Sequence, residues 1–491
     1  MSEKKTGLKR QLSPSHVWAL AFGCVIGWGS FINPGKKFLP NSGVAGTAIA
    51  MALGAAVMIV IAFSYAYMVP KYPRAGGEFI FTKACFGKFP AYICGWFLVA
   101  AYLTNVPMNS TAIGLIVDGL DGPLDILKWG FHYQIAGFDV WAGEMFLAMG
   151  ILVLFGILNI LGVEKAGVIQ TILAALLGGS VLILTIAALV SSKATLANMD
   201  PWWGFNKAEA MAALEDGTYI SADAFAHSGS AGIASAILAT FSIAPWAFVG
   251  FDTIPQAAEE FKFPYKKVSL IMVVAILFGC YVYIANNTIA AAALGKWPDL
   301  IVESSATPWL LLTAAERLLG TPGKLLVGTA VSSAVLSGIM GFYLASSRLM
   351  YSMSRDGYLP KWFGIIDKKH GTPKNALVFC ILISLSGPVL GREALGWFVD
   401  MSSIGASIGF FFTCACSIVT MNRDGDGTPF LKGVSWFGAI ASMLFILLQL
   451  VPIPGLDGVH FCMESYILLI VWIALGIVFY MRQRKFFHSE N

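Results

Sequence analysis

Charged side chains are scarce in this sequence. Asp, Glu, Lys and Arg make up only 12% of the 491 residues, whereas hydrophobic residues make up 57% and the mean hydropathy is +0.73. Soluble domains carry about 25% charged residues, and a soluble core could not bury this much apolar surface. The composition therefore excludes an ordinary soluble protein and indicates that lipid surrounds most of the chain.

Motifs for chemistry are also missing. The six histidines are far apart in the sequence and show no metal-ligand spacing, and no HExxH helix or intramembrane aspartate pair is present. The eight cysteines are scattered, mostly in apolar runs, and predict no disulfide framework. We therefore expect neither an enzyme nor a bound cofactor.

The N-terminal segment is basic and polar without a cleavable apolar stretch, so the first apolar run should be a retained spanning helix.

Long apolar runs are abundant. A spanning helix needs about 20 mostly apolar residues, and the sequence contains twelve such runs. They cover residues 15–39, 43–69, 90–117, 140–161, 166–191, 231–258, 267–295, 322–352, 374–390, 395–420, 433–453 and 464–481. No strand alternation long enough for a barrel is visible, so the prediction is an all-α polytopic protein with 12 transmembrane helices.

The distribution of positive charge predicts the orientation. Twelve spans place both ends on one side, and most of the 32 Lys and Arg residues fall in segments on the side of the N-terminus. The positive-inside rule then makes both tails, 1–14 and 482–491, cytoplasmic in a cell (inner) membrane. The longest outer segment, 192–230, is rich in Trp and acidic residues and is either a short surface helix or an unstructured loop.

The first and sixth runs contain residues that interrupt helices. Gly23, Gly27 and Gly29 weaken the first, because each glycine costs about 1 kcal/mol relative to alanine inside a helix. Pro245 and Gly250 weaken the sixth. Singly, each is more simply a packing residue or a kink. Their occurrence five helices apart favours a transporter of two inverted repeats. The predicted parts are a core of residues 15–420 with repeats 15–191 and 231–420, followed by two additional helices in 421–481.

An unwound helix in a membrane exposes backbone groups that need partners. Leaving them unsatisfied in lipid costs several kcal/mol per group, so such breaks line cavities. Free amides suit a carboxylate and free carbonyls suit an ammonium group, and an amino acid offers both. The predicted substrate-binding residues are Val25, Ile26, Gly27, Trp28, Gly29, Ser30, Ile243, Ala244, Trp246, Phe248 and Gly250.

Four segments resemble motifs of the amino acid–polyamine–organocation superfamily. They are the glycine-rich break at 23–31, the YPRAGGEFIFTK stretch at 72–83, the segment 246–260 with its Ala-Glu-Glu end, and the RLMYSMSRDGYLP stretch within 347–360. The resemblance covers about residues 14–420. It implies ten core helices in two inverted repeats, two extra helices, alternating access around a midplane site, and a small amine-bearing substrate, most often an amino acid.

The coupling ion is left open. Many members of the superfamily have a lysine midway along helix five, but residues 170–180 contain none, so proton coupling through such a lysine is unsupported. A sodium ion is an alternative, although serine in a membrane helix more often bonds its own backbone; exchange without an ion is another. The candidate sodium ligands are Cys24, Val25, Ser332, Ser333 and Ser337.

Charged residues near the predicted cytoplasmic ends are candidates for coupling or gating. Arg348 and Arg355 lie seven residues apart on one helix face. They either close an inner gate by pairing with acids or serve as ordinary positive-inside anchors. The acidic candidates are Glu259, Glu260 and Asp356.

Trp28 stands where the superfamily usually has a small residue. With Trp246 and Phe248 it would crowd the site or offer a π-face to an ammonium group; otherwise it packs away, on helix three or eight. Membrane-embedded acids are usually functional. Asp252 lies just past the second break and is a further coupling candidate, and Glu78 lies in an inner loop, but neither break contains an acid. A polyamine or arginine site would be expected to have one, so a neutral amino acid is favoured.

The sequence thus predicts a secondary active transporter, a symporter or an exchanger, of small neutral amino acids. An amine, polyamine or ethanolamine-type permease is the alternative. A non-transporting nutrient sensor is less favoured, since such proteins usually carry a soluble signalling module. The expected partners are the substrate, H⁺ or Na⁺ where transport is coupled, and the lipid bilayer; no nucleic acid is expected, and the oligomeric state is left open.

Overall fold

The computed structural model describes residues 8–119, 125–135, 138–303, 309–391, 394–452 and 460–483. Parts of the predicted tails, residues 1–7 and 484–491, lie outside the described residues, as does the end of the eleventh predicted run at residue 453. Within the described ranges the chain is a bundle of helices with one small hairpin, and nine helices there are long and apolar enough to cross a membrane.

The first part of the chain forms the elements up to residue 190. They are α1 (Pro14–Val25), α2 (Gly29–Asn33), the π-helical turn η1 (Pro34–Phe38), α3 (Leu39–Lys71), α4 (Gly77–Phe86), α5 (Lys88–Gly119), the short turn η2 (Asp125–Leu127), β1 (His132–Ile135), β2 (Phe138–Trp141), α6 (Ala142–Ile160) and α7 (Val163–Val190).

The remaining elements complete the bundle. They are η3 (Leu196–Met199), α8 (Lys207–Glu215), η4 (Ala222–Phe225), α9 (Gly229–Phe241), α10 (Ala244–Ala247), η5 (Phe251–Thr253), η6 (Pro255–Glu260), η7 (Tyr265–Lys267), α11 (Val268–Ala292), α12 (Trp297–Glu303), α13 (Leu310–Leu319), α14 (Thr321–Arg355), η8 (Lys361–Gly364), α15 (Lys374–Ser384), α16 (Gly387–Leu390), α17 (Ala394–Asp424), α18 (Pro429–Leu450) and α19 (Met463–Arg482).

Helices occupy all twelve predicted runs, but three runs are interrupted. The first is divided between α1 and α2, the ninth between α15 and α16, and the sixth breaks up after α9. The prediction of one helix over 231–258 is wrong in its second half, where only α10 and the 3₁₀ turns η5 and η6 follow. Gly250 has φ +139°, which ends helical geometry, and Pro255 removes another amide donor.

Several elements lie in segments where the sequence predicted no spanning helix. Strands β1 and β2 pair in antiparallel register, with His132 opposite Trp141; this hairpin was not predicted. In segment 192–230, where a surface helix and a loop were both open, residues 207–215 form α8. The Asn206 side chain accepts a hydrogen bond from the Glu209 amide at 3.3 Å and caps that helix.

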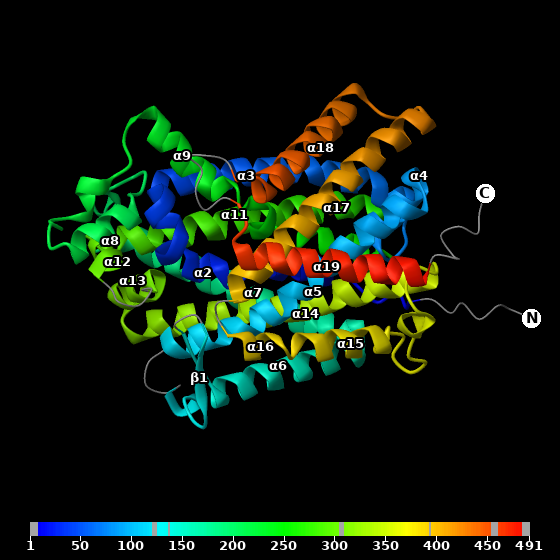
Figure 1. Cartoon of the computed structure of the whole chain (residues 1–491), viewed down its shortest axis with the longest axis horizontal. Helices are drawn as coiled ribbons and strands as arrows, with labels where there is room; N and C mark the ends of the chain where they lie inside the picture. The colour runs from blue at the N-terminus through cyan, green and yellow to red at the C-terminus, as the bar shows by residue number, and fades with distance from the viewer. Residues whose placement is uncertain are drawn as a thin grey trace, which may run out of the picture.

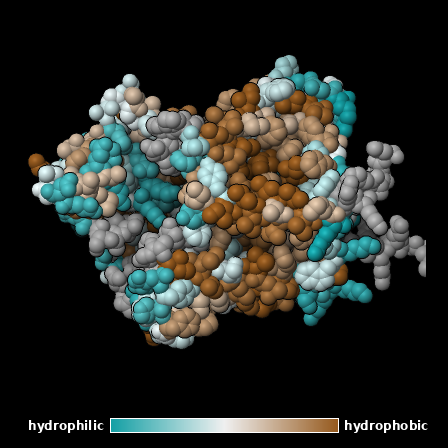
Figure 2. Space-filling view, in the orientation of Figure 1, coloured by the Kyte–Doolittle hydropathy of each residue, from teal (hydrophilic) through white to brown (hydrophobic). Residues whose placement is uncertain are grey.

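The two ends of the bundle differ in what they carry. Helices α8, α12 and α13 and the β1 hairpin gather at the left end in Figure 1, whereas α4 lies at the right end. Hydrophobic residues cover the middle of the visible face in Figure 2, and hydrophilic residues collect at the left and along the right edge. This pattern is that of a polytopic membrane protein whose helices run between the two polar ends.

Burial separates a core from a periphery. Helices α5, α14 and α17 are mostly buried by their neighbours, whereas the apolar faces of α7 and α19 remain largely uncovered. Apolar side chains on an uncovered face suit a lipid-facing position. The interruptions themselves lie within this core, since the end of α1, α2 and α10 are buried, although most of α9 is not. Unwound backbone there can be satisfied by protein groups or a ligand.

Candidate substrate site

The first interruption lies where the glycines predicted it. Helix α1 ends at Val25, and Ile26 leaves helical geometry with φ −99° and ψ 86°. A new helical turn then begins, in which the Phe31 amide donates to the Trp28 carbonyl at 3.0 Å and the Ser30 hydroxyl to the Gly27 carbonyl at 3.0 Å. The amides of residues 30–32 thus donate to the carbonyls of Gly27 and Trp28, and the amides of residues 27–29 are the ones that lack a partner from a preceding helical turn.

The second interruption packs directly on the first. Gly250 lies so close to α1 that a Cβ atom there would be 2.5 Å from the Val25 amide nitrogen and 2.6 Å from the Cys24 carbonyl carbon. Only glycine allows two backbones to approach this closely, and only glycine readily adopts its positive φ. The two unwound segments, far apart in the sequence, thus meet backbone to backbone.

Two tryptophans, one from each interruption, pack against each other. The rings of Trp28 and Trp246 have their centroids 6.0 Å apart at 55°, and the two side chains are 4% and 7% exposed. The Trp246 ring occupies the space that a Cβ atom on Gly29 would need. Trp28 therefore packs toward the second interruption. Its indole Nε1 is buried and has no hydrogen-bond partner among the described residues.

Open space remains beside Gly27. A Cβ atom built there meets nothing within 4 Å, unlike Gly23, Gly29 and Gly250, and Gly27 is half-buried while its neighbours are buried. Asn286 on α11 lies against the same segment, donating from Nδ2 to the Ser30 carbonyl at 3.0 Å, and its buried Oδ1 has no partner in the described chain. Sequence analysis missed Asn286; the signal was an Asn-Asn pair inside an apolar run.

Several other predicted binding residues have side chains that pack on neighbouring helices. Ile26 is buried, and the Val25 side chain packs on α11 at Gly279. Phe248 packs on Tyr283, with ring centroids 6.1 Å apart, and Ala244 lies against Gly54 of α3. Ile243 immediately precedes α10. The structure thus groups Trp28 with Trp246 and sets Gly250 on the end of α1, while the side chains of Val25, Ala244 and Phe248 contact neighbouring helices.

A glutamine and a serine link α1 to α14. The Ser337 hydroxyl lies 3.2 Å from the Gly23 carbonyl, and Gln170 donates from Nε2 to the Ala19 carbonyl at 3.3 Å and to the Ser337 carbonyl at 3.2 Å. Of the other candidate sodium ligands, Ser333 is buried and Ser332 is half-buried. An amide donor thus already uses two of the carbonyls in this region.

The two arginines of α14 pair with adjacent glutamates. Arg348 donates from Nε and Nη2 to both carboxylate oxygens of Glu260, at 3.1 and 3.0 Å, and both side chains are almost completely buried. Arg355 contacts Glu259 at 2.7 Å. The Glu260 carbonyl also accepts the amides of residues 11 and 12, each at 2.9 Å. These contacts tie α14, η6 and the N-terminal segment together at one end of the bundle.

Asp356 was a wrong candidate partner for those arginines. It pairs with Arg74 at 2.9 Å and Lys83 at 2.8 Å, because it follows the last turn of α14 and faces α4. Burial raises the pKa of Asp356, but hydrogen bonds from Lys83 and Arg74 outweigh it, so the pKa lies below its usual range.

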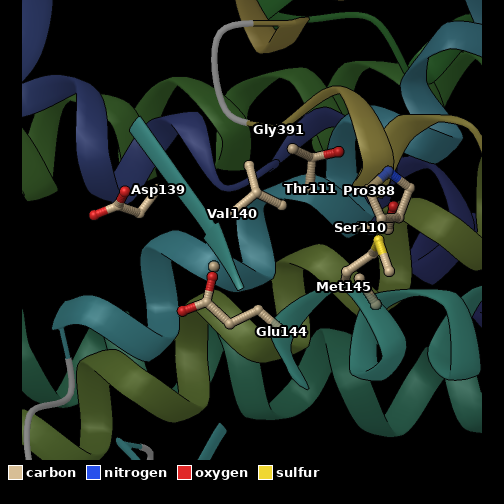
Figure 3. Close-up of a pocket in the computed structure, with 10 residues that line it drawn as sticks. Ser110, Thr111, Asp139, Val140, Glu144, Met145, Pro388 and Gly391 are labelled. Carbon is tan, nitrogen blue, oxygen red and sulfur yellow. The ribbon is translucent and has the colours of Figure 1, made fainter. Parts of the chain in front are cut away.

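A small cavity lies away from the interruptions. Figure 3 shows Ser110 and Thr111 of α5, Val140 of β2, Glu144 and Met145 of α6 and Pro388 of α16 around it. The volume open to the centre of a water molecule is only about 20 Å³, which holds one or two waters. An amino acid does not fit there, so this cavity is not a candidate substrate site.

Comparison with known proteins decides the family. The family model described as "Amino acid permease" matches residues 12–479. This chain belongs to the amino acid permease family. The superfamily resemblance is thereby confirmed, and the protein is a transporter and not an enzyme.

The relatives of this permease carry different substrate names. It is 24% identical to "Branched-chain amino acid permease BcaP" of Bacillus subtilis over 98% of this chain and 94% of that protein. It is 26% identical to "Glutamate/serine transporter AimA" of the same organism, over 94% and 80%. It is 25% identical to "Cationic amino acid transporter 4, vacuolar" of Arabidopsis thaliana over 86% of the chain, which spans 65% of that longer protein.

Proposed function

We propose that this permease is a secondary active transporter, a symporter or an exchanger, that moves small neutral amino acids by alternating access. The observation that carries the proposal is the meeting of the two interrupted segments at Gly250 and Cys24, with open space beside Gly27. Neither interrupted segment carries a charged side chain, which suits a zwitterion.

The backbone supplies both kinds of partner that a zwitterion needs. The amides of Gly27, Trp28 and Gly29, which donate to no backbone carbonyl of the described residues, suit the α-carboxylate. The last carbonyls of α1 suit the α-ammonium group. A substrate there would satisfy groups that otherwise cost several kcal/mol each in an apolar environment.

Side chains around the space favour a small, uncharged substrate side chain. Residues 24–30 and 242–250 contain no Asp, Glu, Lys, Arg or His, so an ionised substrate side chain would find no counter-charge in either break. The Trp246 ring fills the volume beside Gly29, and Trp28 packs against it. The paired indoles also favour the second candidate, an amine or ethanolamine-type permease, since their faces can bind ammonium groups.

The topology proposed from the sequence is retained. We retain twelve spans, two inverted repeats over 15–191 and 231–420, and cytoplasmic termini in the cell membrane. Helices in all twelve runs accord with this topology, as does the position of α4 at the end of the bundle opposite the β1 hairpin. The Lys- and Arg-rich segments around α4 and after α14 support a cytoplasmic position for that end.

Exchange in proteoliposomes tests the proposal. Vesicles loaded with unlabelled amino acid should take up labelled alanine, glycine or serine, and putrescine or ethanolamine should compete poorly. Stronger competition by the amines would replace the leading proposal with the second candidate. Binding of amino acids without exchange would point to a sensor.

A matched pair of variants tests the position of the site. Gly27→Leu fills the open space and should abolish exchange. Gly150→Leu adds the same side chain at an exposed position on α6 that also has nothing within 4 Å, and should retain exchange. Full activity of Gly27→Leu would remove the substrate from this site.

A further inference from the structure

Two cysteines from helices far apart in the sequence meet at the end of the bundle that carries α4 (Figure 1). All eight cysteines of the chain are free thiols. Cys85 lies in the last turn of α4 and is partly exposed, whereas Cys416 lies on α17 and is buried. The two thiols are hydrogen-bonded to each other, and Cys85 Sγ lies 3.6 Å from the Cys416 carbonyl oxygen. They therefore form a pair rather than two isolated thiols.

The spacing of residues on both helices holds this pair in place. Thr82 precedes Cys85 by three residues and Thr420 follows Cys416 by four, so each threonine shares a helix face with its cysteine. Cys85 Sγ lies 3.3 Å from Thr420 Oγ1, and Cys416 Sγ lies 4.0 Å from Thr82 Oγ1. The two faces are thus matched crosswise, with both sulfurs in the contact between α4 and α17. A disulfide would bring the sulfurs from hydrogen-bond contact to about 2.0 Å.

The surroundings of Cys85 favour its thiolate. A hydrogen bond from the Cys416 thiol lowers the pKa of Cys85 to about 7. Burial and the charge of Asp424 oppose this change, whereas Thr420 and the positive charge of Arg423 add to it. The thiolate is the form that attacks an oxidant. Redox-sensing cysteines are typically low in pKa, accessible and next to a second thiol, and Cys85 has all three properties.

The other six cysteines, which all lie in the described part of the chain, are placed differently. Four are buried, namely Cys24, Cys94, Cys380 and Cys414. Cys280 is partly exposed but belongs to the apolar span α11. Cys462 is exposed, and its Sγ lies 3.1 Å from the hydroxyl of Ser465. Cys462 is therefore an accessible thiol whose neighbour is a hydroxyl, and it provides a control for Cys85.

We propose that Cys85 and Cys416 form a peroxide-responsive dithiol that is converted reversibly into a disulfide. The Cys85 thiolate attacks one oxygen of hydrogen peroxide. An S–O bond forms, the O–O bond breaks, and Cys85 is oxidised to a sulfenic acid while the released hydroxide takes up a proton and becomes water. The Cys416 thiol then attacks the sulfenic sulfur. The S–S bond forms, the S–O bond breaks, and the oxygen leaves as water with the Cys416 proton. A reducing thiol reverses the reaction by thiol–disulfide exchange.

The disulfide would connect α17 to contacts that already join α4 to two other elements. Lys83 lies two residues before Cys85 and pairs with Asp356, after α14, at 2.8 Å. A Cβ atom on Gly77 would lie 2.8 Å from Pro255 of η6. In the proposed alternating access this end of the bundle opens, so a covalent bond from α4 to α17 should hold it closed and slow exchange. This consequence rests on the proposed transport function, whereas formation of the disulfide does not.

Oxidation of the purified protein in detergent tests the pair directly. After brief treatment with hydrogen peroxide, free thiols are alkylated and counted, and the peptides are analysed by mass spectrometry. Wild type should lose two of its eight free thiols, show a crosslink between Cys85 and Cys416, and regain both thiols with dithiothreitol. Cys416→Ser should accumulate the sulfenic acid of Cys85, which dimedone labels. Cys85→Ser should lose no thiol.

A matched control removes the exposed cysteine outside the pair. Cys462→Ser should still lose the same two thiols. A wild type that keeps all its thiols overturns the proposal, as does a disulfide between other cysteines, for example one from Cys85 to Cys94. Dimedone labelling of Cys416 in place of Cys85 would also overturn it. The wild-type measurement decides by itself if a variant does not fold.

Alanine exchange in proteoliposomes tests the consequence for transport. Peroxide should slow exchange severalfold in wild type and in Cys462→Ser, dithiothreitol should restore it, and Cys85→Ser should keep its rate. Unchanged exchange by protein that contains the disulfide overturns the regulatory role. If the reduced protein exchanges neither alanine, glycine nor serine, the proposed function is refuted instead, and the thiol count still decides whether the disulfide forms.

Discussion

Replacing Arg348 with methionine removes one half of a fully buried ion pair. Arg348 and Glu260 have side chains 0% and 1% exposed and share two hydrogen bonds of 3.0 and 3.1 Å. Removing one partner leaves a buried charge without compensation, which costs about 3–5 kcal/mol. The Glu260 carbonyl also holds the N-terminal segment, so the closed arrangement at this end of the bundle should weaken with it.

The chain provides a matched control for this variant. Arg355 lies seven residues further along α14 and pairs with Glu259 at 2.7 Å, but these side chains are 28% and 16% exposed. Partly exposed pairs are worth about 0–1 kcal/mol. Arg355→Met therefore makes the same chemical change in the same helix at a much smaller cost.

Unfolding of the purified protein in detergent measures both effects. Arg348→Met should lower the free energy of unfolding by at least about 2 kcal/mol more than Arg355→Met. The double variant Arg348→Met/Glu260→Met should recover most of the loss, because no buried charge is left unpaired. Equal effects of the two single variants, or a double variant less stable than Arg348→Met, would refute the assignment of this pair as a buried, mutually compensating contact.

Three further predictions concern the site and its surroundings. Gly29→Ala should abolish uptake, because its Cβ overlaps the ring of Trp246, whereas Gly27→Ala enters open space and should retain at least about half of wild-type uptake; similar rates for both would contradict this packing. Gln170→Met removes the amide that bridges two carbonyls and should cost about 1–3 kcal/mol in unfolding free energy, so unchanged stability would show that the bridge is dispensable. The pKa of Asp356 is lowered in the folded state, so the stability that its ion pairs contribute is complete above the unfolded pKa near 3.9 and is lost as the pH falls through the folded pKa. Asp356→Asn should therefore reduce the free energy of unfolding equally at pH 6 and pH 8. A loss that differs between these two pH values would contradict the ion pairs.

The sequence determined most of the fold because lipid is a demanding solvent. A chain with 12% charged residues and repeated apolar runs can bury its backbone only in helices, and helices occupy every predicted run. The interruption at residues 26–28 was also readable, since Gly27 and Gly29 weaken a helix wherever they occur. The sequence also predicted the second interruption, but not how far it extends. The turns beyond Gly250 depend on how the backbone at Gly250 packs on α1.

Only the tertiary structure decided which side chains meet. Whether Trp28 faced the second interruption or helices three and eight was open in the sequence, and its contact with Trp246 comes from the packing of segments more than 200 residues apart. The choice of Glu260 for Arg348, and of Arg74 and Lys83 for Asp356, was equally open. Charges of opposite sign attract in many combinations, and only the positions of α4, η6 and α14 select among them.

The buried carboxyl groups of Glu78 and Asp252 show the same division. The sequence placed Glu78 in an inner loop and Asp252 just past a break, 174 positions apart, with nothing to join them. Folding brings α4 against η6 and places the Tyr102 hydroxyl between the two acids. Hydropathy and glycine content act locally and can be read along the chain. The link between the two acids through Tyr102 depends on distances of a few ångströms across the bundle, which exist only once the helices have packed.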